Sequence, residues 1–364
     1  MFSGSYKQSD VRFLLKSINL PFSSLEEKEL LIQNQNKHYS EMLSLEEIPN
    51  SEYMSIFYSA FERNKQKLAL DLIKLAYIIN TDKPQNTIVL TSLARAGTPI
   101  GVLLKYILEL YFDRKTIHYS VSIIRDKGLD FNALKYIIFE KKYLPEQIVF
   151  IDGWTGKGII ANELNNSINN FNHLYNTQIS SNLFVLADLC GYAHGAASNE
   201  DYLIPSSILN STISGLISRS ILNKDYINES IDFHGCVYYK DFEKYDLSNW
   251  FIDETLKCVN NLFNKNITAQ INSQAEKNTL KQLSSDMKEN IKKEFRITNI
   301  NHIKPGIGEA TRVLLRRIPD ILIIKDKDCP DVQHLLLLAK QKKVAIITDI
   351  NLPYKAVSLI KKVL

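Results

Sequence analysis

The residues best suited to do chemistry lie close together, at residues 152–158. This run places a carboxylate, Asp152, and an ammonium group, Lys157, among three glycines. The carboxylate could hold Mg²⁺ or a ribose diol, and glycine lets the backbone approach an anion closely. Apolar residues 148–151 precede the run and a helical pattern follows it at 159–164. This order predicts a strand, a phosphate-binding loop and a helix whose free N–H groups attract anions. A tight turn that uses glycine for geometry alone is the alternative.

A second loop of small residues follows apolar residues 87–91 and carries Arg95. Its guanidinium could hold a phosphate or a carboxylate with two parallel hydrogen bonds. An ordinary turn with a surface arginine would have the same pattern. An apolar helical pattern then runs to residue 110, so the order of strand, loop and helix occurs twice.

The two loops together resemble those of phosphoribosyltransferases, most closely the uracil-type enzymes. The resemblance implies phosphoribosyl pyrophosphate or a nucleotide as ligand, catalytic roles for Asp152 and Arg95, and Mg²⁺ held at Asp152. It assigns phosphate binding to the two loops, with the residues Arg95, Ala96, Gly97, Thr98, Asp152, Gly153, Trp154, Thr155, Gly156, Lys157 and Gly158. The chain departs from the family at Gly153, which stands where a second carboxylate is usual. The spacings of a P-loop and of a Rossmann fingerprint are both absent.

The elements that must position these loops alternate along the chain. Strand patterns at 87–91, 116–124, 148–151 and 183–187 are separated by helical patterns. This alternation predicts an α/β fold with a parallel sheet flanked by helices, of the type I phosphoribosyltransferase-like class that the resemblance implies. Ligands bind such sheets at the carboxyl ends of the strands.

Other polar positions in the body are weaker site predictions. Residues 1–83 read as mostly helical, with residues 37–42 as part of a lid or as a surface turn. Small polar residues between 207 and 219 recur at helical spacing, which fits either a pocket wall or close helix packing. The residues expected to contact a substrate are Asp188, His194, Asp201 and Asn210.

The tail has a different character from the body. Residues 292–364 contain 15 Lys/Arg against 7 Asp/Glu, whereas the whole chain has a net charge of +4. Patterns of helix, strand, helix, strand and a final helix after Pro353 predict a small α/β/α domain. Its segment 304–312 resembles the RNA-gripping segment of Pelota-type domains, which implies RNA binding. The residues concerned are Lys304, Gly306, Gly308, Glu309, Arg312, Arg316 and Arg317. A solvated basic face on a protein-interaction domain is the alternative.

The body as a whole resembles the phosphoribosyltransferase-like proteins found beside bacterial tellurium-resistance stress genes, some of which are labelled cysteine protease StiP. The motifs that carry this are 95–97, 150–158, 200–205 and 209–212. The resemblance implies an enzyme that makes or breaks an N-glycosidic bond in a stress response. We divide the chain into a phosphoribosyltransferase-like domain (1–275), a connecting helix (276–295) and a Pelota-like domain (296–364). A nucleotide-sensing RNA-binding regulator without catalysis is one alternative.

A cysteine protease is the other alternative, and it requires a thiolate beside a base. The four cysteines are scattered, and neither Cys190 with His194 nor Cys236 with His234 matches a protease motif. No apolar run reaches the length of a membrane span and the N-terminus lacks a signal pattern. We therefore expect reduced cysteines, a cytoplasmic location and no membrane partner, and an oligomer is possible.

Overall fold

The structure, a computed structural model, describes residues 2–34, 36–263 and 267–362. Its helices are α1 (Leu25–Gln33), α2 (Ser51–Asp82), α3 (Gly97–Phe112), α4 (Phe131–Lys135), α5 (Ile159–Tyr175), α6 (Ser248–Leu262), α7 (Gln274–Glu294), α8 (Ile307–Arg316) and α9 (Gln333–Gln341). Its strands are β1 (Arg12–Leu14), β2 (Lys16–Ser17), β3 (Thr87–Ala94), β4 (Lys115–Ile124), β5 (Gly128–Leu129), β6 (Ile148–Thr155), β7 (Leu183–Asp188), β8 (Gly195–Ser198), β9 (Gly235–Cys236), β10 (Ile303–Pro305), β11 (Pro319–Ile324), β12 (Ala345–Thr348) and β13 (Ala356–Ile360).

The body is built on a sheet with the strand order β1-β4-β3-β6-β7-β8. These strands pair in parallel, and only the short β5 joins antiparallel, at the end of β4. The central register sets Thr91 of β3 beside Tyr119 of β4 and Phe150 of β6. The prediction of an α/β fold with a mostly parallel sheet is confirmed. The finer assignment to the type I phosphoribosyltransferase fold stays a prediction.

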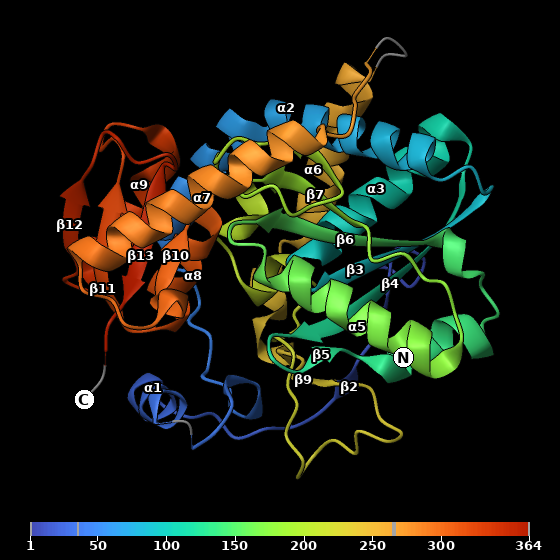
Figure 1. Cartoon of the computed structure of the whole chain (residues 1–364), viewed down its shortest axis with the longest axis horizontal. Coiled ribbons are helices and arrows are strands. Elements are labelled where there is room, and N and C mark those ends of the chain that lie inside the picture. Colours follow the sequence, from blue (N-terminus) through green and yellow to red (C-terminus); the bar gives the residue numbers. More distant parts are fainter. Residues whose placement is uncertain (1, 35, 264–266, 363–364) are drawn as a thin grey trace.

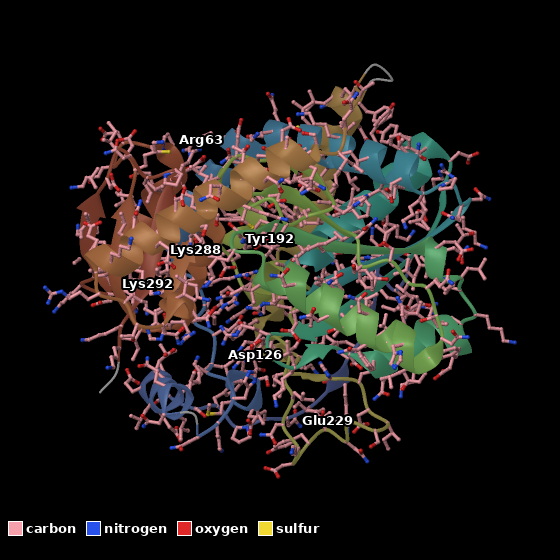
Figure 2. The ribbon with its side chains drawn as sticks, in the orientation of Figure 1. Arg63, Asp126, Tyr192, Glu229, Lys288 and Lys292 are labelled. Atoms are coloured by element: carbon pink, nitrogen blue, oxygen red, sulfur yellow. The ribbon has the colours of Figure 1, made fainter. Side chains whose placement is uncertain are left out.

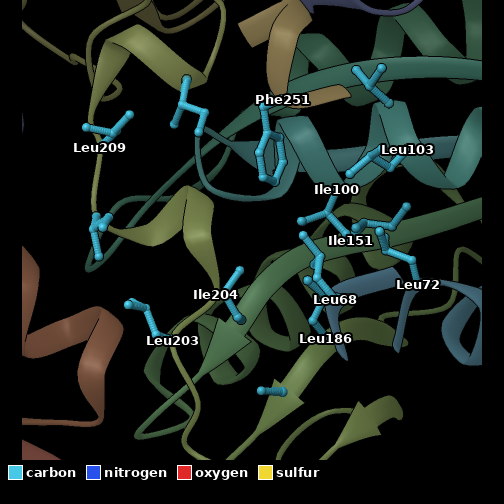
Figure 3. Packing of buried hydrophobic residues seen from close by; sticks show 14 of the residues in the cluster. Leu68, Leu72, Ile100, Leu103, Ile151, Leu186, Leu203, Ile204, Leu209 and Phe251 are labelled. Carbon is cyan, nitrogen blue, oxygen red and sulfur yellow. The ribbon is translucent and has the colours of Figure 1, made fainter. Parts of the chain in front are cut away.

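Helices cover both faces of this sheet because successive strand residues point to opposite faces. Ile151 belongs to the apolar core shared with α2, α3 and α6, whereas Phe150 belongs to the core shared with α4 and α5. Figure 3 shows the first of these cores, where Phe251 of α6 and Leu103 of α3 approach Ile151. Figure 1 shows α5 on the face opposite α2 and α3.

The C-terminal part contains a separate sheet of order β10-β13-β11-β12, packed with α8 and α9. Helix α7 runs diagonally from the body to this domain (Figure 1). Its Met287 and Ile291 are buried in a core that includes Leu189 of the body and Ile303 of the C-terminal domain. Apolar contacts therefore tie the two parts together.

An N-terminal arm, residues 21–50, leaves the body and carries α1 to the C-terminal domain, beneath which α1 lies in Figure 1. The buried carboxylate of Glu29 forms a bidentate ion pair with Arg317, and Lys28 Nζ donates to the carbonyl of Arg316 at 3.1 Å. The arm thus bridges parts of the chain that are far apart in sequence.

Three predictions of secondary structure need correction. Residues 1–83 contain the helices α1 and α2, but Arg12–Leu14 and Lys16–Ser17, read as part of the helical region, pair as strands with β4 and β9. Residues 205–213 form short 3₁₀ turns rather than one helix with a polar face. The final helix predicted after Pro353 is β13, which lies between β10 and β11. In each case, pairing or packing with distant segments outweighs local propensity. Within the described residues, no helix is both long and apolar enough to cross a membrane.

Candidate functional site

A basic cavity of about 260 Å³ lies where the body, the C-terminal domain and the N-terminal arm meet. Its walls come from the loop after β6, from α8 and from the arm. The basic residues that line it are Lys28, Arg125, Lys157, Arg219, Lys304, Arg312, Arg316 and Arg317. The acidic residues in the lining are Asp152 and Glu309. Figure 2 shows side chains crowding this region, with Asp126 labelled near its lower edge and Lys288 on α7 above it. We call this space the basic cavity.

The glycine-rich loop forms one wall of the basic cavity, as its residue types suggest. Gly158 adopts a left-handed conformation, with φ of 76°, and caps the N-terminus of α5. A side chain there would overlap the ring of Tyr192. A Cβ on Gly156 would lie 2.9 Å from the carbonyl oxygen of Pro305 in the C-terminal domain. The loop therefore needs glycine for its turn and for its close approach to the second domain.

Lys157 presents an unpaired charge to the basic cavity. Its Nζ is buried and has no hydrogen-bond partner among the described residues. Burial, followed by the neighbouring charge of Lys304, lowers the pKa of Lys157 to about 7. Burial likewise lowers the pKa of Lys304 to about 8. Two ammonium groups that share only the nearby carboxylate of Glu309, itself paired with Arg312, favour the binding of an anion.

The two acids of the basic cavity differ in their environment. Glu309 pairs with Arg312 at 2.6 Å. Burial alone would raise the pKa of Glu309, but Arg312 and the two lysines hold it below its usual value. Among the described residues, the carboxylate of Asp152 accepts a hydrogen bond only from the N–H of its neighbour Gly153, at 2.8 Å. Burial raises the pKa of Asp152 to about 6, although Arg312 opposes the shift.

A metal at Asp152 would have few protein ligands. The described residues contain no group of three or more His, Cys, Asp or Glu side chains that could hold a metal ion. Mg²⁺ is often held by one or two carboxylates together with substrate phosphates. Asp152 fits that minimal role only if phosphate oxygens supply further ligands, and the Mg²⁺ assignment stays a prediction.

Arg95 lies at the same edge of the sheet but opens into an adjoining cavity of about 170 Å³. Its guanidinium is buried and donates to Glu46 Oε1 at 2.5 Å, to Ile217 O at 2.6 Å and to Asn210 Oδ1 at 3.2 Å. The hydroxyl groups of Thr98, near the start of α3, and of Ser120 in β4 are hydrogen-bonded to each other at 2.8 Å. The structure therefore brings the two predicted loops to neighbouring cavities, with Arg95 already paired to an internal carboxylate.

The four weaker substrate predictions do not line the basic cavity. Asp188 accepts three backbone N–H groups of the loop that follows it, at 2.8–3.0 Å, and so holds that loop. His194 Nε2 pairs with Asp82 Oδ1 at 2.9 Å. Asn210 accepts from both Arg95 and Arg316. The contacts of Asp188 and His194 lie within the body, whereas Asn210 also joins the body to α8 through Arg316.

Asp201 joins the body to the C-terminal domain. Its Oδ1 accepts the N–H of Ile307, the first residue of α8, at 2.9 Å, and its Oδ2 accepts the N–H of Lys355 at 2.8 Å. Burial raises the pKa of Asp201 to about 6. The carboxylate fixes the angle at which α8 meets the basic cavity.

The segment predicted to grip RNA turns inward, toward the body. Five of its seven predicted residues line the basic cavity, namely Lys304, Glu309, Arg312, Arg316 and Arg317. The two glycines instead allow close packing: a Cβ on Gly308 would overlap the indole of Trp154, and a Cβ on Gly306 would lie 2.7 Å from Leu189. The guanidinium of Arg312 lies 4.5 Å from the ring centroid of Trp154, a cation–π contact. The RNA-type segment and the glycine-rich loop are therefore parts of one site.

Four polar residues that line the basic cavity were not among the predicted site residues. Tyr39 lies between Arg125 and Arg219, each 5.3 Å from its ring centroid. Its position within 37–42, the predicted lid, was the signal that could have found it. Lys28 enters with the arm. Neither Lys28, Arg125 nor Arg219 stands in a motif, so their place depends on the tertiary fold.

The cysteine nearest to the basic cavity is Cys190. Its Sγ lies 3.3 Å from Oγ1 of Thr155, which lines the cavity. Burial, followed by Asp188, raises the pKa of the Cys190 thiol to about 12. Burial does the same for Cys236. Among the described residues, no hydrogen bond joins a cysteine to a histidine.

A parallel α/β body joined to a small basic domain, with a cationic cavity between them, defines a two-domain α/β protein with an anion-attracting site. Residues 4–256 match the family described as "Tellurite-like stress resistance cysteine protease StiP", and residues 282–362 match the PELOTA RNA binding domain. The protein from Acinetobacter baylyi (strain ATCC 33305 / BD413 / ADP1) named "Cysteine protease StiP" is 40% identical over 375 residues, covering 99% of this chain and 94% of that protein. This chain belongs to the StiP family.

These comparisons correct the predicted function. The family and its relative are named for cysteine proteolysis, so the phosphoribosyltransferase-like glycosyltransferase acting on phosphoribosyl pyrophosphate is wrong. The alternative of a regulator that senses a nucleotide finds no support in them. The resemblance to StiP-labelled stress proteins and to a Pelota-type RNA-binding domain is confirmed. The boundaries that we placed at 275 and 296 stay a prediction.

Proposed function

We propose that this chain is an RNA-binding member of the StiP family and that the basic cavity holds phosphate groups of the RNA. The observation that carries the proposal is the buried, unpartnered ammonium group of Lys157. It faces a segment of the type that binds RNA in Pelota domains. Lysine and arginine contacts to phosphates supply most of the affinity of proteins for nucleic acids.

The glycine-rich loop, residues 153–158, contributes backbone N–H groups at the start of α5, where the helix dipole favours an anion. Lys157 and Lys304 supply charge from the two sides of the basic cavity. Asp152 is the residue that would hold Mg²⁺ together with phosphate oxygens. The loop around Arg95 would bind a further phosphate only after Glu46 is displaced, because the guanidinium of Arg95 already donates a hydrogen bond to the carboxylate of Glu46.

The test is fluorescence anisotropy with a labelled, 5′-phosphorylated single-stranded RNA of about 12 nucleotides, titrated at several salt concentrations. We expect the double variant Lys157→Ala, Lys304→Ala to bind at least tenfold more weakly. Its log–log salt slope should fall by about 1.4, because each lost phosphate contact on a single strand accounts for about 0.7. The control Lys340→Ala removes an exposed lysine of α9 that does not line the basic cavity. Equal affinity for the double variant and the wild type would refute the proposal.

Cysteine proteolysis is the second candidate, favoured by the name of the family and of its 40%-identical relative. We propose Cys190 as the thiol, because it adjoins the cavity wall at Thr155. A nearby histidine, His194, is already oriented by Asp82, as the base of a triad would be. Proteolysis needs the thiolate, so the thiol must leave its buried site for the reaction.

The experiment is hydrolysis of labelled casein by the full chain, with and without RNA. Cys190→Ser should abolish cleavage, whereas Cys258→Ser, which changes a half-buried cysteine of α6 that does not line the basic cavity, should leave it intact. Cleavage that survives in Cys190→Ser would exclude this thiol. Absence of cleavage by the wild type under both conditions would exclude proteolysis of this substrate.

A further inference from the structure

We infer that the basic cavity receives a terminal phosphate of an RNA strand, a monoester, in preference to an internal phosphodiester. This inference rests on the proposed RNA binding and adds the chemical class of the group that is recognised. It is carried by the size of the basic cavity, by its charge and by the segments that enclose it.

The size of the basic cavity suits one end of a strand. Its volume of about 260 Å³ falls just below the usual range of small-ligand pockets, about 300–1,000 Å³. An internal phosphodiester has nucleotides on both sides and needs a groove that continues in both directions. Here Gly156 approaches Pro305 on one side, and Lys28, Ile32 and Tyr39 of the arm line another.

The excess positive charge of the basic cavity favours a dianion over a monoanion. Arg317 is paired with Glu29 and Arg312 with Glu309. Lys28 donates to a backbone carbonyl, and so does the guanidinium of Arg219.

Lys157 and Lys304 make no hydrogen bond or ion pair with any described residue. A phosphate monoester carries a charge of about −1.5 to −2 at pH 7 and offers three acceptor oxygens. An internal phosphodiester carries a single negative charge and would therefore offset less of the positive charge of the basic cavity.

Further donors and an aromatic ring are in place for the rest of the terminal nucleotide. The N-terminus of α5 opens directly from Gly158, so its first N–H groups face the same loop. Tyr39 and Trp154 both line the basic cavity. Guanidinium groups already contact both rings, so an unpaired base of single-stranded RNA would stack there by displacing an arginine.

The experiment compares three RNAs of one sequence that carry a 5′-phosphate, a 3′-phosphate or hydroxyls at both ends. Each has its fluorophore attached internally. We expect the wild type to bind at least one of the two phosphorylated RNAs at least tenfold more tightly than the RNA with hydroxyls at both ends. Comparison of the 5′-phosphate RNA with the 3′-phosphate RNA then shows which end of the strand is bound. Lys157→Met should bring this ratio close to one, whereas Lys340→Met should preserve it. Thermal unfolding verifies that both variants are folded.

The outcomes separate the inference from the proposal beneath it. Equal binding of all three RNAs by the wild type would overturn the terminal-phosphate inference and leave RNA binding intact. A preference that persists in Lys157→Met would also overturn it, because the preference would then arise elsewhere. Failure of every RNA to bind would refute the proposed function itself.

Discussion

Removing the charge of Lys157 should stabilise the free protein. The pKa of Lys157 is lowered to about 7 by burial and by Lys304, whereas an unfolded lysine titrates near 10.4. The folded state therefore binds fewer protons than the unfolded state between about pH 7 and pH 10.4. The destabilisation is full below pH 7 and disappears as the pH rises toward 10.4.

The magnitude follows from this shift. At pH 7 a difference of about three pKa units corresponds to about 4 kcal/mol. The side chain retains some contact with solvent, so about half of this, roughly 2 kcal/mol, is expected after solvent screening. For a chain of this size, that gain raises the melting temperature of Lys157→Met by about 4 °C.

The assay is differential scanning calorimetry of the wild type and of Lys157→Met at pH 6, 7, 8 and 9, in a buffer without phosphate. The difference in melting temperature should be largest at pH 6 and should shrink steadily toward pH 9. Phosphorylated RNA should raise the melting temperature of the wild type more than that of the variant. Lys340→Met, the exposed control, should show no such trend. A variant less stable than the wild type at pH 6 would refute the view that Lys157 is an uncompensated charge.

Three further predictions concern the contacts around the basic cavity and the buried thiol. Asp201→Ala leaves two buried N–H groups unpaired and should lower the free energy of unfolding by about 2 kcal/mol in urea titrations. The exposed Asp320→Ala should change that free energy by less than about 0.5 kcal/mol; an equal effect of both would contradict the joining role of Asp201. Gly308→Ala should displace the indole of Trp154 and shift the tryptophan emission maximum, whereas an unchanged emission would show that the packing is loose. Because the pKa of Cys190 is raised to about 12, less than roughly one molecule in 10⁴ carries the thiolate at pH 7.5. Iodoacetamide should therefore label it only on unfolding, as mass spectrometry would show, and rapid labelling of the native chain would mean that the thiol is exposed and activated.

The sequence predicted the parts of the structure that depend on local patterns. Alternating strand and helix patterns determine the parallel sheet, because each buried strand reads as a short apolar run. The glycine-rich loop and its two charged residues, Asp152 and Lys157, could likewise be found, since they lie within one short stretch of the sequence. Glu309 and Arg312 of α8 were also predicted as site residues, and both line the basic cavity.

The parts that sequence reasoning missed are set by contacts across long separations. Arg95 looked available for a phosphate, but Glu46, far earlier in the chain, occupies it. Residues 356–360 look helical by composition, yet they fill the space between two strands whose backbone groups need partners. The arm brings Lys28 to the basic cavity through its contact with the C-terminal domain. No local pattern encodes such pairings.

The charges of the basic cavity point to a role in binding rather than in stability. A cluster of charges that only stabilises the fold would pair each cation with a carboxylate, as Arg317 is paired with Glu29. Asp152 is present in the same cavity, yet burial raises its pKa to about 6 while the pKa of Lys157 is lowered to about 7. Opposite shifts of this kind show that the two groups do not neutralise each other, because an ion pair would move both pKa values the other way. An anion bound between Lys157 and Lys304 would offset the repulsion between their ammonium groups, so their proximity favours anion binding.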